Sequence, residues 1–255
     1  MAWYKDFFEK WYLDIYHSAQ IFKPSYIKKG VSFIKEILNL GKGVKILDLC
    51  CGQGRHLVPL AKMGYRMTGL DLSKKALALL EKELRSKKIK ARIIRSDMRK
   101  IPFKNEFDAV INMFTSFGYL ENDYENLRVL KAVNKALKPG GKFLIDVINR
   151  DWLINGDRLS RNFSSKHWDK RGNLLILEER NYDFKTKRQI VKIWILDKKG
   201  KWHKTAYSLR LYSLSEMRNN LNKVGFKIIK VYGSTVEKQK FTKNSHRLVI
   251  LARKK

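Results

Sequence analysis

The sequence predicts an α/β fold, in which helices cover a mainly parallel sheet and an antiparallel unit is inserted. Between about residues 28 and 148, short apolar runs alternate with amphipathic stretches, a pattern typical of right-handed βαβ units. After residue 150 three extended runs follow one another with short connections, which indicates an antiparallel meander. A chain of 255 residues is long enough to bury a large hydrophobic core.

The first half alternates between predicted helices and strands. Apolar residues from Ile27 to Leu38 fall on one helical face, and Gly41 and Gly43 end that helix. Ser73 is the expected N-cap of a later helix. We expect strands at 44–49, 66–70, 91–95, 107–113 and 142–148, and further helices at 55–63, 74–84 and 124–137.

The second half contains the inserted unit and then returns to the first pattern. The expected meander strands are 173–184, 188–196 and 202–212, and they are followed by a helix at 215–224 and strands at 226–231 and 246–253. We therefore expect an N-terminal helical cover over 1–30 and a core formed by 31–150 and 213–255. The antiparallel unit over 151–212 would then be inserted between the two parts of this core.

Composition limits the class of partner. The 55 Lys and Arg residues outnumber the 24 Asp and Glu residues, and the net charge of +31 suggests an anionic partner such as nucleic acid or a membrane surface. The basic residues are spread along the chain without a run of five like charges, which is more typical of a solvated surface. We therefore regard nucleic acid as a less favoured partner than a small molecule, and an anionic small molecule would suit the more basic second half of the chain.

The cysteines and the N-terminus bear on location. Cys50 and Cys51 are adjacent and lack a second pair for zinc, so we expect no metal site and a reducing compartment. The first residues mix charges with aromatics and do not resemble a signal peptide. The apolar runs are too short to cross a bilayer. We expect a cytoplasmic protein, monomeric or homodimeric, that does not bind a membrane.

The strongest local signal is the segment Val44-Lys-Ile-Leu-Asp-Leu-Cys-Cys-Gly-Gln-Gly-Arg-His, a buried strand that runs into a glycine turn. Gly52 and Gly54 would let the backbone approach a ligand closely. Asp48 ends this strand and Asp71 ends the next one, where a carboxylate can bind ribose hydroxyls. A dinucleotide site would need a third glycine where Leu57 stands, and Asp48 would repel pyrophosphate. These residues favour a nucleoside that carries an amino acid.

With these features the chain resembles the class I S-adenosylmethionine-dependent methyltransferases. Asp48-x-Cys50-x-Gly52-x-Gly54 resembles their first motif, with Cys50 in place of the first glycine. Further segments that resemble family motifs are Asp71-Leu72, Ser96-Asp97-Met98, Phe107–Tyr119 and Leu137–Phe143. The resemblance implies a Rossmann-like seven-stranded sheet of order 3-2-1-4-5-7-6 with strand 7 antiparallel. It also implies that Tyr12 and Tyr16 belong to a helix over the cofactor, and that the insertion resembles the lid of small-molecule members.

The resemblance implies a set of site residues. For several of them a structural role competes: Tyr12, Tyr16, Phe114 and Phe117 could be core, Asp97 a turn residue, and Arg55 and His56 exposed. The implied cofactor-binding residues are Tyr12, Tyr16, Asp48, Cys50, Gly52, Gly54, Arg55, Asp71, Leu72, Ser73, Asp97, Met98, Asn112, Met113 and Phe114, and the implied substrate-facing residues are His56, Phe117 and Tyr119.

The activity implied by the resemblance is in-line transfer of a methyl group from S-adenosylmethionine, which leaves S-adenosylhomocysteine. Proximity, alignment and exclusion of water would do most of the catalysis. His17, His56 and Tyr119 are the candidate general bases, but none is predicted to act as one. Two alternatives stay open, namely methylation of RNA or another polyanion, and a cofactor-binding module without catalysis.

Overall fold

The computed structural model describes residues 6–16, 23–155 and 164–255. Its main sheet has seven strands in the order β10-β11-β5-β4-β1-β2-β3. β11 pairs antiparallel with both β5 and β10, whereas the remaining pairs are parallel. The predicted strand order is therefore confirmed. The strands are β1 (Lys45–Leu49), β2 (Arg66–Asp71), β3 (Arg92–Arg95), β4 (Phe107–Asn112), β5 (Leu137–Ile148), β10 (Phe226–Tyr232) and β11 (Arg247–Lys254).

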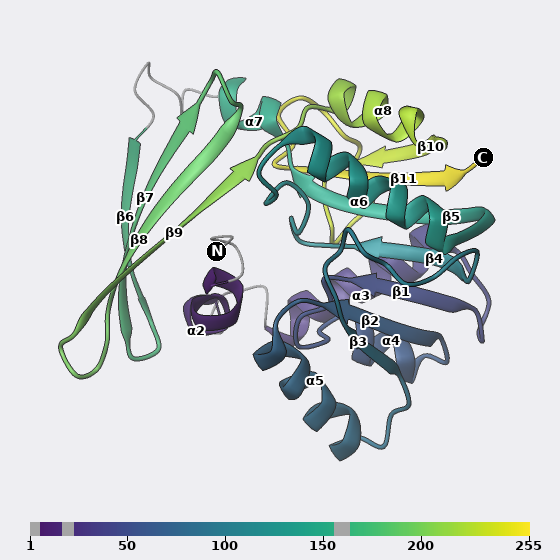
Figure 1. Ribbon diagram of the computed structural model, residues 1–255, viewed down its shortest axis with the longest axis horizontal. Helices are drawn as coiled ribbons and strands as arrows, with labels where there is room; N and C mark the ends of the chain where they lie inside the picture. The colour runs from purple at the N-terminus through teal and green to yellow at the C-terminus, as the bar shows by residue number, and fades with distance from the viewer. Residues whose placement is uncertain (1–5, 17–22, 156–163) are drawn as a thin grey trace.

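Helices cover both faces of this sheet (Figure 1). One face packs against the apolar sides of α3 (Pro24–Leu38), α4 (Leu57–Lys62) and α5 (Lys74–Ser86). The other face packs against α6 (Asp123–Ala136) and α8 (Leu214–Lys223). As predicted, Ser73 caps α5, since its hydroxyl accepts a hydrogen bond from the Ala76 amide at 3.1 Å.

A second sheet has four antiparallel strands, β6 (Ser164–Arg171), β7 (Leu174–Asp183), β8 (Arg188–Leu196) and β9 (Trp202–Arg210). We call this sheet the lid. Three strands were predicted, and β6 was missed because it is an edge strand whose sequence Ser-Ser-Lys-His-Trp-Asp-Lys-Arg is almost entirely polar. The helix α7 (Arg150–Asn155) was also not predicted. β5 begins five residues earlier than expected because Leu137 already pairs with Phe107.

The N-terminal segment lies between the lid and the core (Figure 1). It consists of a π-helical turn, η1 (Phe7–Trp11), and the helix α2 (Tyr12–Tyr16). Toward the lid, the buried Phe7 ring packs 5.0 Å from the Tyr207 ring. Toward the core, the Glu9 carboxylate accepts a hydrogen bond from the Lys74 amide at the start of α5, at 2.9 Å. The segment thus joins the two units.

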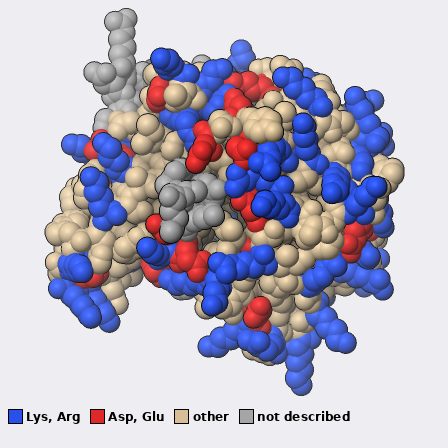
Figure 2. Space-filling model, viewed as in Figure 1, with Lys and Arg blue, Asp and Glu red and all other residues tan. Residues whose placement is uncertain are grey.

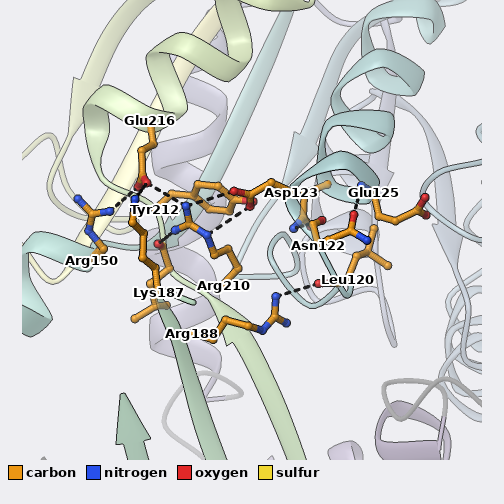
Figure 3. A network of polar contacts seen from close by, with 12 residues as sticks. Leu120, Asn122, Asp123, Glu125, Arg150, Lys187, Arg188, Arg210, Tyr212 and Glu216 are labelled. Carbon is orange, nitrogen blue, oxygen red and sulfur yellow. Dashed lines mark hydrogen bonds and ion pairs between the residues drawn. The ribbon is translucent and has the colours of Figure 1, made fainter. Parts of the chain in front are cut away.

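The lid is attached to the core by a network of charged side chains that we call the lid root: Asp123, Arg150, Lys187, Arg210, Tyr212 and Glu216 (Figure 3). Glu216 accepts hydrogen bonds from Arg210 at 2.8 Å and from Arg150 at 2.7 Å. Asp123, at the start of α6, accepts one from the Tyr212 hydroxyl at 2.7 Å. Residues from β9, α6, α7 and α8 therefore meet at one place.

Figure 2 shows Lys and Arg scattered over the visible face, with Asp and Glu between them. On this face the basic residues do not gather into a single stripe. Their distribution is that of a solvated surface, on which isolated charges contribute little to stability. No helix in the described part of the chain is long and apolar enough to cross a membrane.

Candidate functional site

The loop after β1 makes a tight turn of left-handed residues. Cys50, Gly52 and Gly54 have φ values of 62°, 55° and 85°. A Cβ added at Gly52 would meet no atom within 4 Å, whereas one at Gly54 would lie 2.3 Å from Cδ1 of Leu80. The glycine at 54 is thus required by the packing of α5 against the loop, and Gly52 leaves open space above it.

Asp71, at the end of β2, joins the two loops at this edge of the sheet. One carboxylate oxygen accepts a hydrogen bond from the Gly52 amide at 2.8 Å, and the other accepts one from the Ser73 amide at 2.9 Å. Burial raises the pKa of this carboxyl, although the backbone donors act in the opposite direction. The side chain is therefore held in one orientation by backbone groups.

Asp48, at the end of β1, is a buried carboxyl with only part of its hydrogen bonding satisfied. The residue is 2% exposed. Its Oδ2 atom has no hydrogen-bond partner in the part of the chain that the structure describes. Burial raises the pKa of Asp48 from 3.8 to about 7, although the nearby Arg55 lowers it. A ligand that brings a positive charge would stabilise the ionised form.

A single cavity, which we call the main pocket, opens beside this loop. Its walls come from the loops after β1, β2, β3 and β4 and from the N-terminal segment, so it lies at the carboxyl ends of the parallel strands, where open α/β sheets bind ligands. The predicted residues that line it are Tyr12, Cys50, Gly52, Arg55, Asp71, Leu72, Ser73, Asp97, Met98, Met113, Phe114 and Tyr119. Lining residues that were not predicted to bind include Phe8, Leu13, Gln53, Ala76, Ser116 and Leu120.

The other predicted site residues lie elsewhere. Asp48 is buried near the end of β1, and Gly54 packs against Leu80 of α5. Asn112 donates a hydrogen bond to the Leu49 carbonyl at 2.8 Å, which joins the ends of β4 and β1. Tyr16 stacks on Tyr12 with ring centroids 5.1 Å apart.

Of the three predicted substrate-facing residues, Tyr119 lines the main pocket, whereas His56 and Phe117 do not. Phe117 is 1% exposed and packs in the core against Tyr212. His56 lines a different, smaller cavity beside Gly30. Phe8 could have been found from the aromatic run at the N-terminus, whereas Ser116 and Leu120 carry no sequence signal.

Burial favours the neutral form of several side chains near the main pocket. Burial raises the pKa of Tyr119 well above 10 and lowers the pKa of His56 well below 6.5. Burial also raises the pKa of the Cys50 and Cys51 thiols well above 9. Tyr119 can therefore donate or accept a hydrogen bond, but it does not present a phenolate. His17 lies outside the described residues.

The described residues offer no metal site, since no three or more His, Cys, Asp or Glu side chains among them are placed to hold an ion. The lining of the main pocket combines the carboxyls of Asp71 and Asp97 with the rings of Phe8, Tyr12, Phe114 and Tyr119. Its apolar and aromatic lining with a few placed polar groups is typical of sites for small molecules.

Comparison with known proteins gives a family match over residues 46–141, to a model described as a methyltransferase domain. One curated relative is a cypemycin N-terminal methyltransferase from a Streptomyces species. It is 32% identical over 104 residues, which is 41% of this chain and 42% of the relative. The match covers 42% of the length of two further curated relatives and up to 58% of others, so the chain spans about half of their length.

Solved structures match over nearly the whole chain. An S-adenosylmethionine-dependent methyltransferase from Clostridium acetobutylicum has a TM-score of 0.78 at 22% identity, and the match covers 94% of this chain and 96% of that one. An amino pentose methyltransferase from Micromonospora echinaspora, solved with S-adenosylmethionine bound, has a TM-score of 0.69 at 19% identity and covers 96% and 98%. At these identities the likeness establishes the fold. Residues 46–141 therefore match a methyltransferase domain, and the whole chain has the Rossmann-like fold and strand order of S-adenosylmethionine-dependent methyltransferase structures.

Proposed function

We propose that the protein transfers the methyl group of S-adenosylmethionine to a small-molecule acceptor, and that the main pocket is its cofactor site. The observation that carries this proposal is the pair of carboxyls at the ends of β1 and β2. Asp48 has a buried oxygen without a partner in the described chain, and Asp71 lines the main pocket. A ligand with an ammonium group and a ribose would suit both: its hydroxyls can donate to Asp71 in the pocket, and its positive charge would stabilise the ionised form of the neighbouring Asp48, which interacts with Arg55 and Asp71.

The remaining residues of the main pocket suit the rest of such a ligand. Leu72, Met98 and Met113 offer an apolar surface for an adenine ring. Arg55 lines the pocket next to the open space above Gly52, where it could bind the carboxylate of the amino-acid part. All four residues belong to the predicted cofactor-binding set, and all four line the main pocket.

When bound, this cofactor supplies an electrophilic methyl group on a positively charged sulfur. The chain's own contribution is to orient and to exclude water, because Phe8, Tyr12 and Tyr119 cover the pocket with packed aromatic rings. Tyr119 stays protonated at neutral pH, since burial raises its pKa. The acceptor therefore arrives with a free electron pair and does not depend on this residue as a base.

A small-molecule acceptor is favoured by the closed architecture of the lid and the N-terminal segment. The lid packs on η1, and η1 caps α5, so the main pocket is covered from above. The structural neighbour that acts on an amino pentose aligns with nearly all of this chain, lid included. We include in the proposal a cytoplasmic location, a monomeric or homodimeric state and the domain division at 1–30, 31–150 with 213–255, and 151–212.

Calorimetric titration with S-adenosylmethionine and S-adenosylhomocysteine tests the cofactor site. The wild type is expected to bind both, and Asp71→Ala to weaken binding by more than tenfold because the ribose loses its charged acceptor. Asp108→Ala is the control, since Asp108 pairs with Lys138 at the amino end of β4 and should leave the affinity unchanged. Absence of binding by the folded wild type would overturn the proposal.

Turnover is tested separately. The wild type is incubated with S-adenosylmethionine and a panel of hydroxylated small molecules, which includes neutral and anionic members and amino sugars, and formation of S-adenosylhomocysteine is followed. Product with one class of acceptor identifies the substrate. Acceptance of RNA in preference to every small molecule in the panel would contradict the small-molecule assignment.

A further inference from the structure

The turn after β4 is held in a strained conformation. Phe114 and Thr115 are consecutive residues with φ values of 64° and 58°, in the left-handed region. This conformation costs roughly 1–2 kcal/mol for a residue with a Cβ, and Thr115 is β-branched, for which it is a clear outlier. Such strain persists only where the surroundings fix it, and it is concentrated at functional sites.

The surroundings that fix this turn come from β5 and β11. The Asp146 carboxylate, which is fully buried, accepts a hydrogen bond from the Phe114 amide at 2.7 Å. Arg247 binds the same carboxylate at 2.8 and 2.6 Å and donates to the Thr115 hydroxyl at 2.7 Å. A buried bidentate pair therefore holds the turn in place.

The result of this arrangement is the position of the Phe114 ring. The guanidinium carbons of Arg55 and Arg247 lie 4.2 and 5.5 Å from the ring centroid, which is the range of cation–π contacts. The ring lines the main pocket, the small cavity that contains His56, and a larger cavity beyond it. It is thus a wall that all three spaces share.

The larger cavity, which we call the second cavity, has a volume of about 500 Å³. This lies in the range of ligand sites, roughly 300–1,000 Å³. Its aromatic walls are Tyr26 and Trp152, and the segment 233–247 adds hydroxyl and amide groups, His246 and Arg247. None of the described residues that line it is a carboxylate. Its chemistry suits a hydroxylated molecule that is neutral or anionic.

We propose that Phe114 is the specificity-determining wall between the main pocket and the second cavity, and that the methyl acceptor binds in the second cavity as a hydroxylated, neutral or anionic small molecule. This inference rests on the proposed function. In-line transfer requires the acceptor to approach the methyl carbon on the side opposite the sulfur, so that its electron pair forms the new bond while the pair of the sulfur–carbon bond returns to sulfur. A longer group on the sulfur therefore points toward the acceptor's cavity.

The test is calorimetric and uses two probes, S-adenosylmethionine and its analogue with a but-2-ynyl group in place of the methyl group. In the wild type the analogue should bind more weakly, because the Phe114 ring blocks the longer group. Phe114→Ala should raise the affinity for the analogue at least tenfold relative to S-adenosylmethionine, which is the scale of discrimination by a few carbon atoms in a pocket. Phe114→Leu, which perturbs the turn less, should give a smaller gain in the same direction.

Two controls show which residue and which cavity account for the gain in affinity for the analogue. Phe8→Ala removes an aromatic ring that lines the main pocket but not the other two cavities, and it should give no such gain. Ser234→Trp or Thr235→Trp, added to Phe114→Ala, refills the second cavity and should abolish the gain. Thermal unfolding confirms that each variant is folded.

The outcomes separate this inference from the proposed function. If the folded wild type binds neither S-adenosylmethionine nor S-adenosylhomocysteine, the proposed function itself fails. If it binds S-adenosylmethionine but Phe114→Ala does not favour the analogue, or Phe8→Ala favours it equally, Phe114 is not the wall. If the gain in affinity for the analogue survives the refilling substitutions, the longer group does not enter the second cavity, and the acceptor does not bind there.

Discussion

The loop edge of the main pocket and the lid root are held together by different kinds of contact. At the loop edge, Asp71 is bound by backbone amides of residues near it in the fold, Gly52 and Ser73. At the lid root, charged side chains meet from distant parts of the chain, as in the pair of Arg210 with Asp123, which are 87 residues apart. Figure 3 shows that these side chains come from several helices and strands.

This difference predicts how each region responds to mutation. Backbone donors stay in place when a side chain is changed, so substitutions at the loop edge should mainly change ligand affinity. A buried ion pair leaves an uncompensated charge when one partner is removed. Substitutions at the lid root should therefore reduce the free energy of unfolding and leave cofactor affinity nearly unchanged.

The largest effect is expected for Arg210→Ala. The Arg210 side chain is 7% exposed and pairs with both Asp123 and Glu216. Its loss should lower the free energy of unfolding by about 3 kcal/mol, the lower end of the cost of breaking a buried pair, because the side chains of Asp123 and Glu216 are 58% and 22% exposed. Urea unfolding measures this. Lys187→Ala is the control, because Lys187 is 46% exposed and such a pair contributes about 0–1 kcal/mol. Equal losses in the two variants would contradict the comparison.

The same contrast explains what the sequence could predict. The loop after β1 follows from a local motif, in which residue type and spacing are fixed by backbone geometry, and the strand order was implied by the family resemblance that such motifs carry. The lid root and the clamp on Phe114 have no such signature, since Arg247 and Asp146 are 101 residues apart. β6 was missed for a related reason, because Trp168 is its only large apolar residue and an edge strand needs few.

The next effect concerns Asp48 and pH. Because burial raises the pKa of Asp48 to about 7, ionisation is less favourable in the folded protein than in the unfolded chain. The free energy of unfolding should therefore fall as the pH rises from about 4 to 7 and then level off. The total decrease in the free energy of unfolding is at most about 4 kcal/mol, which corresponds to the difference between the two pKa values.

Asp48→Asn removes the ionisable carboxyl and with it this pH dependence of the free energy of unfolding. The variant should be more stable than the wild type at pH 8 and similar to it at pH 4, and it should bind S-adenosylmethionine more weakly because the ammonium group loses its partner. Thermal unfolding of the ligand-free proteins across this pH range, with calorimetry at pH 8, makes both measurements. Parallel stability curves for the two proteins would refute the assignment.

Two glycines, Gly118 beside the lid root and Gly52 at the loop edge, test the same comparison through the backbone. Gly118 has φ 108°, and a Cβ there would lie 2.5 Å from the Arg210 carbonyl oxygen at the lid root. Gly118→Ala should cost about 2–3 kcal/mol of stability. Gly52→Ala meets open space, so its left-handed φ should cost only about 1 kcal/mol, while the added methyl group lowers cofactor affinity. Urea unfolding and calorimetry distinguish the two, and the reverse pattern would contradict the roles assigned to them.

The smallest effect is expected at two helix caps, one in each region. The hydroxyls of Ser73 and Ser213 accept hydrogen bonds from the amides of Ala76 and Glu216, at 3.1 and 3.3 Å. Each Ser→Ala substitution should cost about 1 kcal/mol, since one helix amide loses its acceptor. Only Ser73 lines the main pocket, so Ser73→Ala alone should weaken S-adenosylmethionine binding. If Ser213→Ala weakened binding as much, the lid root would be coupled to the cofactor site, and the two regions would not be independent.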